Sequence, residues 1–156
     1  MVLYQILNSE FNAFCATPGQ AALDLYPPEK RDAIDEVNRW VYTGLNNGVY
    51  KAGFARSQGA YDEAVQGVFE TLDRLEEILS RTRWLTGGPT VTLADVRLFT
   101  TLIRFDPVYV GHFKCNKYTL SGGHYPNLWA FTRDFYNLPG IAETIDIEDA
   151  RVHYYL

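Results

Sequence analysis

The strongest hydrophobic pattern in the chain lies between Thr92 and Pro107. After Thr92 the apolar positions fall on nearly every side of a helix, at Leu93, Ala94, Val96, Leu98, Phe99, Leu102, Ile103 and Phe105. Such a pattern is typical of a helix buried in a core. Thr92 and Asp95 have the spacing of a capping box, in which a hydroxyl and an acid three residues later satisfy the helix start. We therefore predict a capped central helix, ended by Pro107, at the core of an all-α domain.

Three further segments show helical spacing. Apolar residues recur every three or four positions from Ala33 to Leu45, until Asn46-Asn47-Gly48 interrupts the pattern. A second stripe predicts a long helix from about Ser57 to Arg81. Pro126 suits the first turn of a third helix, which Leu138-Pro139-Gly140 stops. Together with the central helix, these segments predict a helical bundle.

The N-terminal segment shows a different pattern. Val2, Tyr4 and Ile6 alternate with other residues, which predicts a short strand over residues 1–7. No partner strand is evident, and an isolated strand is not stable. We therefore interpret residues 1–16 as a remnant of, or a linker from, another domain. Residues 17–156 are expected to form the helical domain.

Composition and charge narrow the class of protein. A chain of 156 residues with 47% apolar residues is long enough for one globular core. The net charge of −5 argues against nucleic acid as a partner, and no apolar run approaches the roughly 18 residues of a membrane span. Cys15 and Cys115 lie far apart and form no CxxC motif, which favours reduced thiols and a cytoplasmic protein.

Few residues suggest metal or acid–base chemistry. His112, His124 and His153 show no metal-ligand spacing, and His112 with Cys115 makes only a weak HxxC pair. We therefore expect no metal site. Asp95 lies in the predicted core, but we interpret it as a structural cap, because a buried helix start needs an acceptor for its N–H groups.

The tyrosines are the more informative residues. The chain has 11 of them. Tyr50 follows the break at Asn46-Asn47-Gly48, and Tyr154 stands beside His153 near the end. A neutral phenol donates a hydrogen bond to an oxygen of a bound ring while its own ring packs against that ligand. On spacing alone, core and interface filling remains the favoured interpretation and ligand binding the alternative.

Four strings resemble one family. They are NNGVYKAGFA (46–55), TLADVRLFTTLIRFDPVYVGHFKCN (92–116), YPNLWAFTRDFYNLPGIAET (125–144) and His153-Tyr154-Tyr155. Residues 25–155 as a whole resemble the C-terminal helical domain of glutathionyl-hydroquinone reductases, the xi class of omega-like glutathione transferases. The resemblance implies a two-domain enzyme in which a thioredoxin-like domain binds glutathione as cosubstrate. Its cysteine takes the glutathionyl group from a glutathionyl-hydroquinone, and a second glutathione releases the enzyme.

The resemblance also assigns residues in this chain. Tyr50 and Tyr154 match the family tyrosines that contact the hydroquinone oxygens, and Tyr109 lies in a matching motif. The helical domain would wall the hydroquinone pocket and help to form a homodimer. Neither Cys15 nor Cys115 matches the catalytic cysteine, so we assign no catalytic residue here. We expect the chain to need a thioredoxin-like domain, in cis or in trans. The alternative is a non-catalytic binding or dimerisation module.

Overall fold

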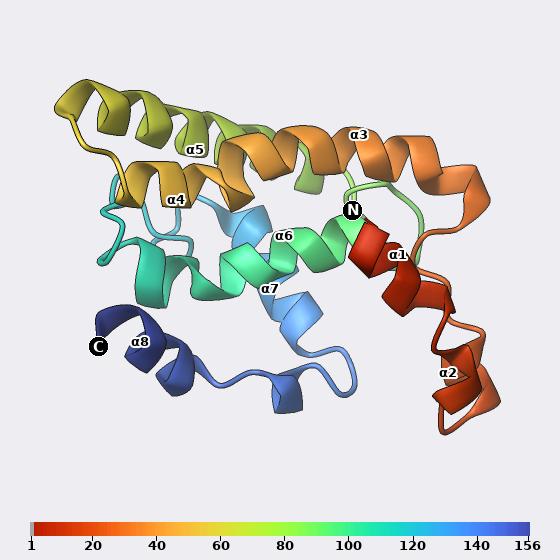
Figure 1. The fold of residues 1–156 in the computed structure, drawn as a ribbon. Coiled ribbons are helices and arrows are strands. Elements are labelled where there is room, and N and C mark those ends of the chain that lie inside the picture. The colour runs from red at the N-terminus through yellow and green to blue at the C-terminus, as the bar shows by residue number, and fades with distance from the viewer. Residues whose placement is uncertain (1) are drawn as a thin grey trace.

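The computed structural model describes residues 2–156, which form an all-α fold without strands (Figure 1). The α-helices are α1 (Val2–Ser9), α2 (Pro18–Ala21), α3 (Arg31–Val41), α4 (Gly48–Gly53), α5 (Gln58–Leu79), α6 (Leu93–Arg104), α7 (Pro126–Tyr136) and α8 (Ile147–Tyr155). Short 3-10 turns cover Asn12–Phe14, Pro28–Lys30 and Ala142–Thr144. Two π-helical turns cover Tyr42–Asn46 and Phe105–Tyr109. The prediction of an all-helical bundle is confirmed.

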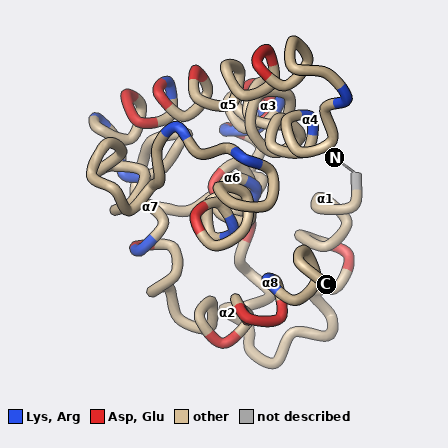
Figure 2. Tube along the Cα trace, turned by 90° about the vertical axis from the view of Figure 1, so that its left-hand side faces the viewer, with Lys and Arg blue, Asp and Glu red and all other residues tan. Residues whose placement is uncertain are grey.

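Helix α6 is the central element of the bundle. It packs against α3, α7 and the π-helical turn that follows α3, and Figure 2 shows it with helices on several sides. At its start, the backbone N–H and the hydroxyl of Thr92 donate to Asp95 at 2.8 and 2.9 Å. The backbone N–H of Leu85 donates to the same carboxylate at 2.8 Å. Burial raises the pKa of Asp95, and these hydrogen bonds oppose the rise.

The sequence pattern overstated how completely α6 is buried. Leu98 and Leu102 lie in the core, but Arg97 and Arg104 are only half-buried and Thr100 is exposed. The polar residues therefore leave one stripe of the helix open. This stripe faces the cleft described below.

The predicted strand at residues 1–7 is wrong, since helix α1 occupies Val2–Ser9. A lone strand leaves its backbone N–H and C=O groups without partners, whereas a helix pairs them internally. A short run rich in apolar residues does not distinguish the two forms by periodicity alone. Two hydrogen bonds hold α1 to the loop after α2. Asn8 accepts one from Leu25 N at 2.8 Å and donates one to Asp24 at 2.8 Å.

Two of the predicted helix interruptions lie at π-helical turns. Asn46-Asn47-Gly48 joins the turn Tyr42–Asn46 to α4, so α3 and α4 continue along one side of the molecule next to α5 (Figure 1). Pro107 lies inside the turn Phe105–Tyr109, which begins directly after α6. Wider π-helical turns change the direction of side chains and occur frequently at functional sites.

Helix α7 is fixed by a carboxylate from α5. The side chain of Glu76 accepts hydrogen bonds from Asn127 N at 2.9 Å and Leu128 N at 2.8 Å. These are donors of the first helical turn, which have no partner within the helix itself. Positions of both charge signs are spread over the helices (Figure 2). No helix within residues 2–156 is long and apolar enough to cross a membrane.

Candidate functional site

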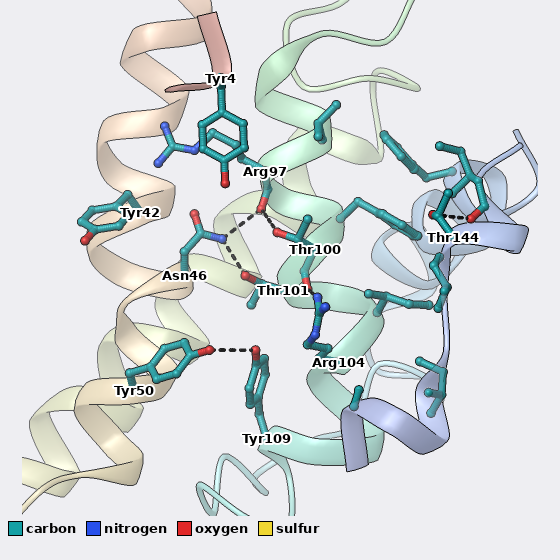
Figure 3. Close-up of a pocket in the computed structure, with 18 of the residues that line it drawn as sticks. Tyr4, Tyr42, Asn46, Tyr50, Arg97, Thr100, Thr101, Arg104, Tyr109 and Thr144 are labelled. Carbon is teal, nitrogen blue, oxygen red and sulfur yellow. Dashed lines mark hydrogen bonds between the residues drawn. The ribbon is translucent and has the colours of Figure 1, made fainter. Parts of the chain in front are cut away.

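A cleft of about 1310 Å³ opens along the exposed stripe of α6 (Figure 3). One wall comes from α3, α4 and the π-helical turn between them, and the opposite wall comes from residues 141–154. The polar wall is anchored to α6 because Asn46 Nδ2 donates to Thr101 Oγ1 at 2.7 Å and to Arg97 O at 3.1 Å. Apolar lining comes from Phe99 and Ile103 of α6, Phe135 of α7, and Ile141 and Ile145 of the opposite wall.

Three tyrosine hydroxyls meet at one end of this cleft. Tyr50 comes from α4, Tyr109 from the π-helical turn after α6, and Tyr154 from α8. The hydroxyl oxygens of Tyr50 and Tyr154 are 2.5 Å apart, those of Tyr109 and Tyr154 are 3.3 Å apart, and those of Tyr50 and Tyr109 are 3.5 Å apart. We call these three residues the tyrosine cluster. The three tyrosines singled out from the sequence therefore share one site.

A buried phenylalanine holds the rings of the tyrosine cluster. Phe113 stacks on Tyr109 with an interplanar angle of 4° and a centroid distance of 5.4 Å. Its centroid also lies 5.1 Å from that of Tyr50 and 5.8 Å from that of Tyr154. Room for Phe113 depends on Gly53, because a Cβ at that position would lie 2.1 Å from Phe113 Cδ1.

Helix α8 reaches the cluster through its last turns. The Tyr155 hydroxyl donates to Val108 O at 3.3 Å, and a Cβ at Gly111 would lie 2.6 Å from that hydroxyl. The ring of His112 lies against both Tyr154 and Tyr155. The segment 108–113 thus fixes α8 and, with it, the position of the Tyr154 hydroxyl.

The electrostatics of the cluster favour neutral phenols. Burial raises the pKa of Tyr109, and its hydrogen bonds with Tyr154 and Tyr50 raise it further. Burial also raises the pKa of Tyr154, although the hydrogen bond with Tyr109 and, to a smaller extent, the Arg104 guanidinium lower it in part. Since an ordinary tyrosine pKa is already about 10, both hydroxyls keep their protons at neutral pH. They are hydrogen-bond donors with aromatic walls, a combination suited to an oxygenated aromatic ring.

The chain is similar to known proteins in both sequence and structure. Residues 58–134 match the family model of the glutathione S-transferase C-terminal domain. The glutathionyl-hydroquinone reductase YqjG of Escherichia coli K12 is 54% identical over 98% of this chain and 44% of its own length. Its glutathione-bound structure superposes with a TM-score of 0.88 at 55% identity, over 96% of this chain and 46% of that one. The glutathionyl-hydroquinone reductase PcpF of Sphingobium chlorophenolicum is 47% identical, over 98% of this chain and 47% of its own.

A fungal structure gives the same result. The xi glutathione transferase of Phanerochaete chrysosporium superposes with a TM-score of 0.90 at 49% identity, over 97% of this chain and 50% of that one. In sequence and fold, this chain matches the C-terminal helical domain of the glutathionyl-hydroquinone reductases, the xi class of glutathione transferases. It spans about half the length of the relatives it matches.

Within this xi-class domain, neither cysteine lies in the cleft. Cys15 is exposed near the N-terminus, and Cys115 is buried, with its backbone N–H donating to Tyr109 O at 3.0 Å. Burial raises the pKa of the Cys115 thiol to about 12, so it remains protonated at neutral pH. No group of three or more His, Cys, Asp and Glu side chains in residues 2–156 has the arrangement of a metal site.

Sequence reasoning missed several residues of the xi-class cleft. Arg97 and Arg104 line it, yet neither was singled out. Two arginines seven positions apart in an otherwise apolar helix share one face, and this spacing was an available signal. Asn46 was assigned only to a helix break, and Phe113 appeared only within the family-like string 92–116. Their contacts depend on residues more than 50 positions away in the chain, which periodicity does not reveal.

Proposed function

We propose that this domain forms the aromatic wall of a glutathionyl-hydroquinone reductase and binds the hydroquinone part of its substrate. The observation that carries this proposal is the convergence of the Tyr50, Tyr109 and Tyr154 hydroxyls in a partly apolar cleft. Similarity to known proteins supports it, because the relatives YqjG and PcpF are named glutathionyl-hydroquinone reductases.

The cluster suits a hydroquinone in two respects. A ring oxygen of the ligand takes the place of one tyrosine partner and receives hydrogen bonds from the remaining hydroxyls, each worth about 0.5–1.5 kcal/mol. Phe99, Ile103 and Ile145 supply apolar surface along the cleft for the ring itself. Because the phenols of Tyr109 and Tyr154 stay protonated, they donate to the ligand oxygen and add no negative charge beside it.

The sulfur chemistry requires a cysteine from outside residues 2–156. We infer that a thioredoxin-like domain, in cis or in trans, supplies it together with the glutathione site. Its thiolate attacks the sulfur of the glutathionyl-hydroquinone, so that an S–S bond forms, the C–S bond breaks and the aromatic carbon takes up a proton. A second glutathione thiol then forms glutathione disulfide and releases the cysteine. In this chain the buried, protonated Cys115 and the distant Cys15 do not serve as that nucleophile.

The N-terminal segment supports a role in association. Leu3, Leu7, Phe11 and Phe14 are exposed apolar side chains on or near α1. Exposed apolar surface of this kind tends to be covered by a partner. We infer that residues 1–16 adjoin the thioredoxin-like domain and that the protein forms a homodimer. Light scattering of the purified chain tests the second statement, and a strictly monomeric mass contradicts it.

Turnover tests the proposed enzyme. Glutathione and a glutathionyl-hydroquinone are supplied to the chain alone and to the chain mixed with a separately expressed thioredoxin-like domain of a relative. We expect no hydroquinone release from the chain alone, release from the mixture, and a lower rate when the chain carries Tyr154→Phe. Activity of the chain alone contradicts the account of its cysteines.

The second candidate is a non-catalytic module that binds aromatic ligands or mediates dimerisation. The absence of a reactive thiol from the cleft, within residues 2–156, favours it. The same mixture separates the two candidates. A chain that binds hydroquinone but gives no turnover with any thioredoxin-like partner is a module of this kind.

A further inference from the structure

Three arginines line the cleft outside the tyrosine cluster, and one of them, Arg39, forms an ion pair with Glu36. Arg97 and Arg104 both lie on the stripe of α6 that lines the cleft (Figure 3). They are seven residues apart, which places them on one face of the helix about 10 Å apart along its axis. Both are half-buried, so their charges are screened less by solvent than those on an open surface.

Neither arginine has a carboxylate partner within residues 2–156. The ion pairs in this range join Arg39 to Glu36, Arg81 to Glu77, Arg83 to Asp134 and Arg151 to Glu148. Arg104 Nη1 donates to Thr100 O at 2.7 Å, which fixes the side chain. The Arg97 guanidinium lies 5.6 Å from the ring centroid of Tyr4 and 5.8 Å from that of Tyr42.

The acidic residues that line the same cleft form no ion pair with these arginines. Asp35 accepts a hydrogen bond from the Tyr26 hydroxyl at 2.8 Å, and Asp146 caps α8 through Asp149 N at 2.9 Å. Asp149 also lines the cleft, but it forms no ion pair with either arginine. A guanidinium carries five N–H donors, so Arg104 keeps several of them for a ligand after its single bond to Thr100.

Arg104 also lies next to the tyrosine cluster. It follows Ile103 of the apolar lining and precedes the π-helical turn that carries Tyr109. Its charge is close enough to influence the Tyr154 hydroxyl. In Figure 3 its side chain lies between Thr100 and Tyr109. A ring bound at the cluster would therefore bring its substituents toward this guanidinium.

We propose that Arg104, assisted by Arg97, forms a carboxylate-binding subsite beside the tyrosine cluster. This proposal rests on the proposed function in one respect, namely that the aromatic ring of the hydroquinone binds at the tyrosine cluster. Arginine suits this role because its planar fork matches both oxygens of a carboxylate. The carboxylate comes either from an acidic substituent of the hydroquinone or from glutathione, and the two sources share the same chemistry.

Paired ligands distinguish the sources. The full chain is titrated by anaerobic calorimetry with 2,5-dihydroxyphenylacetate, with its neutral amide and, separately, with glutathione. Wild type is compared with Arg104→Gln, Arg104→Lys, Arg97→Gln and a control, Arg133→Gln, which removes the same charge from the exposed surface of α7 outside the cleft. Each titration is repeated at low and high salt.

We expect the acid to bind about tenfold more tightly than the amide in wild type and in Arg133→Gln, a typical strength for a partly exposed charge-assisted pair. In Arg104→Gln the acid and the amide should bind about equally tightly, because the affinity for the acid falls and that for the amide stays the same. It should be intermediate in Arg104→Lys, decline in Arg97→Gln, and weaken at high salt.

A second outcome also supports the subsite. If acid and amide bind equally tightly, but glutathione binds wild type and not Arg104→Gln, then glutathione is the source of the carboxylate. The subsite is overturned if acid and amide bind equally tightly in all variants and glutathione either does not bind or binds independently of Arg104. Failure of the amide to bind any variant instead contradicts the proposed function, and the glutathione titration still decides the subsite.

Discussion

The substitution Gly53→Ala tests how the tyrosine cluster is held in place. The new Cβ would lie 2.1, 2.4 and 2.7 Å from three ring atoms of Phe113, whereas ordinary contacts begin near 3.4 Å. The ring or the backbone must therefore shift by at least 0.9 Å, the difference between 3.0 and 2.1 Å, and by 1.3 Å to reach an ordinary contact of 3.4 Å. Phe113 is buried and stacks on Tyr109, so its displacement also moves the cluster.

The energetic cost follows from two opposing effects. Overpacking of a core costs about 1–3 kcal/mol, while alanine gains up to about 1 kcal/mol over glycine in a helix. We expect Gly53→Ala to lower the free energy of unfolding by about 1–2 kcal/mol and to weaken hydroquinone binding. The control is Gly67→Ala in the middle of α5, where the added Cβ meets nothing within 4 Å. It should raise stability by about 0.5–1 kcal/mol.

Urea unfolding of both variants, followed by circular dichroism, measures these changes. A Phe113→Leu substitution in the Gly53→Ala background gives the coupling, because residues in contact deviate from additivity by about 0.5–3 kcal/mol. The smaller side chain should relieve the overlap and recover part of the loss. Equal stabilisation by Gly53→Ala and Gly67→Ala, with no coupling to Phe113, would refute the packing argument.

Three further predictions follow from burial and hydrogen bonding. Asp95→Ala leaves the buried N–H groups of Leu85 and Thr92 without an acceptor. It should lower the free energy of unfolding in urea by about 3 kcal/mol, more than Asp95→Asn does, and a loss below about 1 kcal/mol contradicts this. Toward a thiol reagent, Cys15 should react at once and Cys115 only on unfolding, and equally fast reaction refutes this. Burial raises the pKa of Tyr109 and Tyr125 in the folded state. Above about pH 10 these tyrosines lose their protons more readily in the unfolded chain, so the free energy of unfolding should fall as pH rises. An unfolding midpoint in urea that stays the same above about pH 10 contradicts this.

Much of the fold could be predicted from local signals. The Thr92–Asp95 cap, the stripe of α5 and Pro126 at the start of α7 are each encoded within one or two helical turns. The helix α1 was predicted as a strand, because its short apolar run fits both periods and its stability depends on contacts such as that of Asn8 with Leu25.

The geometry of the site could not be predicted in the same way. Tyr50 and Tyr154 are 104 positions apart, and their meeting depends on two π-helical turns and on α8, which no periodic pattern encodes. Family resemblance selected the three tyrosines, but it gave neither their mutual distances nor the role of Phe113. Arg104 escaped notice because a charged residue near the end of a helix is usually only solvated or paired with the helix dipole.

Calorimetric titration with 2-methylhydroquinone tests the central claim most directly, because it measures binding at the tyrosine cluster without requiring turnover. The titration compares wild type, Tyr50→Phe/Tyr154→Phe and the control Tyr136→Phe, whose hydroxyl lies outside the cleft. The account predicts a wild-type complex that Tyr136→Phe retains and that the double variant weakens about tenfold or more, through loss of two hydrogen bonds. Equal affinity in all three proteins, or no binding by wild type, would contradict it.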